Sequence, residues 1–87
     1  MKAFLWQNVV DVSDSWHNDG SVLVVAEGLS EARALFAAYS EDRKIPRSVG
    51  EKGRPPPRRI EDAAPGRVYD VGNANAEVLV FPDAGCC

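Results

Sequence analysis

The stretch Ser21-Val-Leu-Val-Val-Ala26, followed at once by Glu27-Gly-Leu-Ser-Glu31, decides the fold. The first six residues form an almost unbroken apolar run rich in β-branched side chains, which predicts a central strand rather than an edge strand. The next residues predict the start of a helix. Ser30 can accept a hydrogen bond from an unpaired backbone N–H, and Glu31 lies at the favourable, positive end of the helix dipole.

The residues after this start continue the helix. Apolar side chains recur at positions i, i+3, i+4 and i+7, which places a stripe on one helix face. The stripe consists of Ala32, Leu35, Phe36 and Tyr39. We expect this helix to cover one side of a sheet and to end by about Arg43, because Pro46 disfavours helical geometry at Ile45.

The segment Lys2–Val12 precedes the central run and alternates as a strand does. Its two expected faces carry Phe4, Trp6, Val10 and Val12 on one side and Ala3, Leu5 and Val9 on the other. Apolar side chains on both faces predict an interior position in the sheet. Residues 13–20 between the two strands are mostly turn formers, so we expect an antiparallel hairpin with a long tip.

Two further strands are expected at Arg67–Val71 and Ala76–Phe81, joined by Gly72-Asn-Ala-Asn75 in a second hairpin. The order strand, strand, helix, long loop, strand, strand describes an α+β protein. Its four-stranded, mostly antiparallel sheet would carry one helix on one face. The other face would be partly bare, with Phe4 or Trp6 on it, and would offer a patch to a second copy or to a host protein.

The chain of 87 residues is expected to form a single domain, 1–87, that contains a long basic, proline-rich loop at residues 44–66. The net charge of -3 hides a segregation of charge along the chain. Residues 1–42 carry two basic and seven acidic side chains, residues 43–67 eight basic and three acidic, and residues 68–87 three acidic and none basic. Such segregation of charge influences which partners a protein attracts more than it determines the fold.

Three interpretations of the basic loop remain open. Arg54, Arg58 and Arg59 flank three consecutive prolines, and guanidinium groups on an extended segment suit bidentate contacts with carboxylate or phosphate. The loop could bind a protein with an acidic patch, or it could bind nucleic acid, although the chain as a whole is acidic. It could also lie on the acidic parts of its own chain and neutralise them.

The expected hairpin tip is the second candidate site. Tryptophan is enriched at binding hot spots, which makes Trp16 a candidate contact. It could equally fold back over the end of the sheet. Asp14 and Asp19 are candidate partner contacts, since carboxylates near strand ends can imitate a phosphate backbone, and a solvated acidic surface is the alternative. His17 is interpreted as a turn imidazole that bonds its neighbours.

The sequence contains no motif for catalysis, for a cofactor or for a phosphate-binding loop. Cys86 and Cys87 are adjacent, and a disulfide between them would not cross-link distant parts of the chain. We therefore interpret them as reduced thiols. A zinc site completed by His17 would still lack a fourth ligand. No apolar run reaches the roughly 20 residues that span a bilayer, and the N-terminus does not read as a signal peptide, so a cytoplasmic location is expected.

Four short strings carry a resemblance to a known kind of protein. They are Met-Lys-Ala-Phe-Leu-Trp-Gln-Asn-Val at residues 1–9, Asp-Ser-Trp-His-Asn-Asp-Gly at 14–20, Leu-Ser-Glu-Ala-Arg at 29–33 and Val-Phe-Pro-Asp-Ala-Gly-Cys-Cys at 80–87. Together they resemble small phage and prophage accessory proteins, and anti-CRISPR proteins are similar in layout. The resemblance implies a stoichiometric inhibitor of a CRISPR–Cas effector in the host bacterial cell. No binding residue can be carried over from it.

These observations predict a non-enzymatic phage or mobile-element protein, without cofactor or metal, that binds and inhibits a bacterial defence complex. The alternative is a small nucleic-acid-associated protein that grips phosphate with its basic loop. No membrane partner is expected, and the protein would be a monomer or a homodimer. The residues predicted to bind the partner are Asp14, Trp16, Asp19, Arg54, Arg58 and Arg59.

Overall fold

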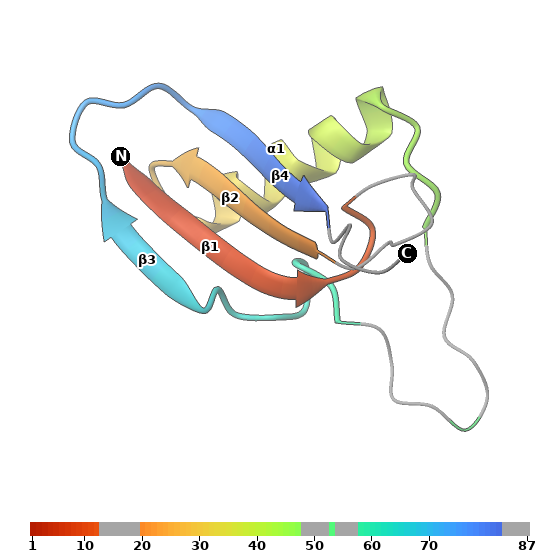
Figure 1. The fold of residues 1–87 in the computed structure, drawn as a ribbon. Coiled ribbons are helices and arrows are strands. Elements are labelled where there is room, and N and C mark those ends of the chain that lie inside the picture. The colour runs from red at the N-terminus through yellow and green to blue at the C-terminus, as the bar shows by residue number, and fades with distance from the viewer. Residues whose placement is uncertain (13–19, 48–52, 54–57, 83–87) are drawn as a thin grey trace.

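The structure is a computed structural model that describes residues 1–12, 20–47, 53 and 58–82. It consists of one helix and a four-stranded sheet of order β3-β1-β2-β4 (Figure 1). The elements are β1 (Lys2–Val9), β2 (Gly20–Ala26), α1 (Leu29–Asp42), β3 (Arg67–Asp70) and β4 (Glu77–Pro82). All three neighbouring pairs of strands are antiparallel, which confirms the predicted α+β class.

The two central strands, β1 and β2, form the predicted antiparallel pair, with Phe4 opposite Val24 and Trp6 opposite Val22. The register is interrupted between Trp6 and Val9 by a bulge, where Asn8 adopts a positive φ of 56°. The bulge changes the alternation of the strand, so that Val9 is fully buried in the core beside Trp6. The prediction that Val9 lies on the opposite face from Trp6 is therefore wrong.

The two outer strands do not form the predicted second hairpin. β3 pairs with β1 and β4 pairs with β2, so they lie at opposite edges of the sheet. Their connection passes the N-terminus: Val71 N donates to Met1 O at 3.2 Å, and the Met1 ammonium donates to Gly72 O at 3.1 Å. In this arrangement both outer edges of the β1–β2 pair are hydrogen-bonded to a further strand. A β3–β4 hairpin would leave one of these edges without a partner strand.

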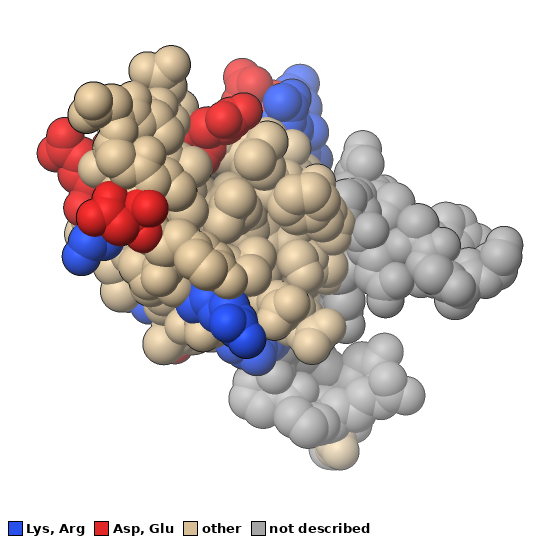
Figure 2. All heavy atoms as spheres, turned by 60° about the vertical axis from the view of Figure 1, so that its left-hand side comes forward, with Lys and Arg blue, Asp and Glu red and all other residues tan. Residues whose placement is uncertain are grey.

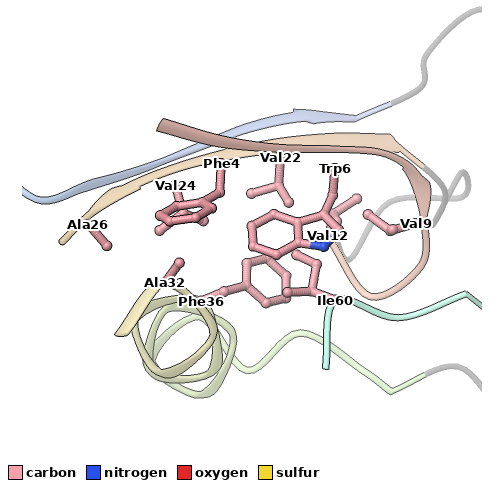
Figure 3. Packing of buried hydrophobic residues seen from close by; sticks show 10 residues of the cluster. All are labelled: Phe4, Trp6, Val9, Val12, Val22, Val24, Ala26, Ala32, Phe36 and Ile60. Atoms are coloured by element: carbon pink, nitrogen blue, oxygen red, sulfur yellow. The ribbon is translucent and has the colours of Figure 1, made fainter. Parts of the chain in front are cut away.

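The core lies between α1 and one face of the sheet (Figure 3). Phe4 and Trp6 point from β1 towards Ala32 and Phe36 of α1, and their side chains are buried. The prediction that one of these aromatic residues lies on the bare face is therefore wrong, because the register of β1 places both in the rows of Val22 and Val24. The predicted helix stripe is confirmed: Ala32 and Phe36 are buried, and Leu35 and Tyr39 pack against the core.

The ends of α1 agree with the prediction except for the cap. The N-cap is Gly28, in an extended conformation without a side-chain cap, and Ser30 lies exposed inside the first turn. Ser30 is therefore not the capping residue that the sequence predicts, because the helix begins at Leu29, two residues before the start that a Ser30 cap would give. Glu31 does lie in the first turn, and Arg43 is the C-cap.

The predicted long loop at residues 44–66 contains neither helix nor strand in its described part. It is nevertheless not all solvated: Ile60 is only 3% exposed and belongs to the core cluster. A turn follows in which the N–H groups of Asp62 and Ala63 both donate to the carbonyl oxygen of Arg59. The end of the loop is thus packed against the body of the protein.

Replacing Ile60 with alanine tests this packing. We expect Ile60→Ala to lower the free energy of unfolding by about 2–4 kcal/mol, because it leaves a cavity in the core. Ile45→Ala removes the same atoms from a half-buried position outside the core cluster and should cost about 1 kcal/mol or less. Urea denaturation of both variants measures the difference, and equal losses would show that residue 60 is not a core position.

Candidate functional site

A cavity of about 470 Å³ lies between α1 and the residues that follow it, the chain after β1 and the segment 59–61. Its walls combine apolar and charged side chains from segments that are far apart in the sequence. The apolar part consists of Val10, Phe36, Ala37, Ile45 and Ile60. The charged part consists of Asp11, Arg33, Glu41, Lys44, Arg47, Arg59 and Glu61. We call this cavity and its rim the binding end of the protein.

Two contacts fix the end of the basic loop beside the end of β1. The N–H of Val10 donates to the carbonyl oxygen of Arg58 at 2.9 Å. Next to it, Arg59 Nε donates to Asp11 Oδ2 at 2.9 Å, in an ion pair whose side chains are only 18% and 13% exposed. These contacts hold residues that are 48 positions apart in the sequence, and they form one wall of the cavity.

Arg33 connects α1 to the same segment. Its Nε donates to the carbonyl oxygen of Ile60 at 3.0 Å, and its Nη2 donates to that of Ala63 at 3.1 Å. The Ala63 oxygen also accepts a hydrogen bond of 2.9 Å from the indole N–H of Trp6. Sequence reasoning missed Arg33. The sequence offered one indication of its role. Besides Lys2, Arg33 is the only lysine or arginine in residues 1–42, and it stands beside the apolar stripe of the helix.

The exposed charged residues of the cavity lining are two cations, Lys44 and Arg47, and two carboxylates, Glu41 and Glu61. Arg47 pairs with Glu61, and this hydrogen bond is the main cause that raises the pKa of the Arg47 guanidinium. Lys44 follows α1 at a positive φ of 54°, with its N–H bonded to the carbonyl oxygen of Glu41. Lys44 and Arg58 are exposed and make no ion pair with a described residue.

The residues predicted to bind a partner are only partly described. Asp14, Trp16, Asp19 and Arg54 lie outside the described residues, as do His17, Cys86 and Cys87. Arg58 is exposed and directly precedes Arg59 of the cavity wall. Arg59 is half-buried and bonded to Asp11, so for this guanidinium the internal interpretation of the basic loop holds.

The face of the sheet that α1 does not cover is a second notable surface. In Figure 1 the sheet lies in front of α1, so this open face is turned towards the viewer. Its exposed apolar side chains include Tyr69, Leu79 and Phe81, which are 47%, 38% and 54% exposed. Figure 2, turned by 60° from that view, shows a broad area of uncharged residues with charged side chains towards its margins.

In the described ranges, no three His, Cys, Asp or Glu side chains are grouped closely enough to hold a metal ion. The described part of the chain likewise contains no helix of the length and apolarity needed to cross a membrane.

The fold and its surfaces define a small α+β protein with a charged cavity at one end and an open apolar sheet face. In comparisons with known proteins, no protein-family model, no curated protein and no solved structure matches the chain.

A double-mutant cycle tests the Arg59–Asp11 contact. We expect Arg59→Ala and Asp11→Ala to be coupled by about 1–2 kcal/mol in the free energy of unfolding, because the pair is largely shielded from water. The matched pair Arg47 and Glu61 has side chains 62% and 52% exposed and should couple clearly more weakly, because water screens it. Equal coupling in the two pairs, measured by thermal or urea unfolding, would contradict the structural distinction between them.

Proposed function

We propose that this protein is a non-enzymatic phage or mobile-element protein that attaches to a bacterial defence complex in the host cytoplasm and blocks it. A CRISPR–Cas effector is the first candidate target. The observation that carries the proposal is the binding end, where the base of the basic loop is bonded to the end of β1 beside a cavity whose exposed lining includes Lys44 and Arg47. Such an arrangement presents cations on a rigid support, which reduces the entropy lost on binding.

The composition of the cavity favours a protein partner over a nucleic acid. Its wall mixes three carboxylates with four cations, so it lacks the one-signed basic surface that is typical of nucleic-acid-binding sites. Phe36, Ile45 and Ile60 provide apolar surface suited to a side chain inserted by a partner. A partner segment with an aromatic or aliphatic residue flanked by acids would match both the apolar wall and the exposed Lys44 and Arg58.

Charge reversal at Arg58, the exposed neighbour of Arg59 of the cavity wall, tests the proposal in cells. Expression of the wild-type protein should restore plaque formation by a phage that the defence system of the host otherwise excludes. We expect Arg58→Glu to reduce this effect at least about tenfold, because it replaces attraction to an acidic partner with repulsion. Lys2→Glu alters the net charge by the same amount at the start of β1 and should leave the effect unchanged.

Equal activity of the two charge-reversal variants would remove Arg58 from the mechanism. A gel-shift titration of the wild-type protein with DNA and RNA provides the complementary measurement. Binding that weakens steeply as salt rises would identify a nucleic-acid partner and contradict the proposal.

Filling the cavity is the second test of the same function. Ala37 is an exposed residue of α1 that lines the cavity, whereas the adjacent Ala38 is exposed and does not line it. We expect Ala37→Trp to weaken target binding at least about tenfold by occupying the space of the partner side chain. Ala38→Trp carries the same cost in helix propensity, about 0.5 kcal/mol, and should bind normally. Binding curves with the purified target complex distinguish the two, and unaltered binding of Ala37→Trp would exclude the cavity from the interface.

A further inference from the structure

The open face of the sheet is ordered in rows that cross all four strands. One row contains Tyr69, Ala3, Val25 and Glu77, and the next contains Arg67, Leu5, Leu23 and Leu79. Phe81 follows on β4, opposite Ser21 of β2. The small Ala3 and Val25 are buried, while the larger apolar side chains are partly or largely exposed. The two full rows thus form a continuous apolar surface in which only the residues at two edges are charged.

Those two charges have opposite signs and lie on opposite edges. Arg67 belongs to β3 and Glu77 to β4, and the two central strands separate them. A two-fold axis parallel to the strands exchanges the edges, so that β3 of one copy lies over β4 of the other. Arg67 of each copy then lies one row from Glu77 of the other, within reach of its long side chain. The face is therefore complementary to itself in charge as well as apolar.

From this self-complementarity we infer that the open face binds a second copy of the same chain and forms a two-fold symmetric dimer. The two sheets would pack face to face with roughly aligned strands, as in a β-sandwich. Phe81, Leu79 and Tyr69, the most exposed apolar residues of the face, would be covered at the contact. The dimer uses a surface distinct from the binding end, so the inference does not rest on the proposed function.

The size of the face determines how strong this dimer is. Four strands about 4.8 Å apart and three rows about 7 Å apart give a face of about 19 by 20 Å. Two such faces bury on the order of 800 Å² in total, which is about half of the roughly 1,600 Å² typical of stable complexes. We therefore expect a weak, reversible dimer with a Kd on the order of 10–100 μM.

A charge exchange between Arg67 and Glu77 tests the arrangement. Sedimentation equilibrium of the full chain, from 5 to about 500 μM in reducing buffer, should show a monomer–dimer equilibrium in the wild-type protein. Arg67→Glu and Glu77→Arg should each raise the Kd at least about tenfold, because the symmetry repeats every pair twice. The double variant should return the Kd to within about threefold of the wild-type value. Within one chain the two residues are about 14 Å apart across three strand spacings, so this rescue can only arise between copies.

An apolar variant separates the face from other modes of association. Phe81→Ser lies at an exposed position and should fold normally, as checked by circular dichroism, but should raise the Kd about tenfold or more. A wild-type protein that is monomeric at all concentrations would overturn the inference, as would a double variant without rescue. If the monomeric protein instead bound its defence target through Leu79 and Phe81, the face would belong to that target and the dimer would be excluded.

Discussion

The carbonyl oxygen of Ala63 is the point on which the arrangement of this protein depends. It accepts a hydrogen bond from Trp6 of β1 and another from Arg33 of α1, at 2.9 and 3.1 Å. Sheet, helix and the end of the basic loop are therefore held by one acceptor, and the buried Ile60 adds apolar packing beside it. The indole N–H of Trp6 and the Nη2 group of Arg33 are both largely shielded from water. Losing their shared acceptor would therefore cost more free energy than the loss of a hydrogen bond at the surface.

A second constraint is that one helix can cover only one face of a four-stranded sheet. α1 shields the rows of Phe4 and Trp6, and the described residues place no helix or strand on the opposite face. The exposed Tyr69, Leu79 and Phe81 are the consequence. Exposed apolar surface of this extent favours association when charges of opposite sign lie at its edges. Arg67 and Glu77 lie at the two edges of this face.

Local patterns in the sequence were sufficient for most of the fold. The β-branched run of β2, the stripe of α1 and the glycine at position 72, which has a φ of 63°, each determine structure within a few residues. The bulge before Val9 and the separation of β3 from β4 depend on pairing between distant segments, which no local pattern contains. The same holds for the candidate site: the exposed Arg58 was predictable from charge, whereas the pairing of Arg59 with Asp11 and the bonds of Arg33 arise only when the chain has folded.

The two surfaces can act together because of the direction of the proposed symmetry axis. An axis parallel to the strands leaves the strand direction unaltered, so both copies present their binding ends towards the same side. A target with two copies of the recognised feature could then be held at two points, and the second contact would form at a high effective concentration. A weak dimer is suited to this purpose, since a target that binds both copies stabilises the dimer by the same free energy that the dimer contributes to binding.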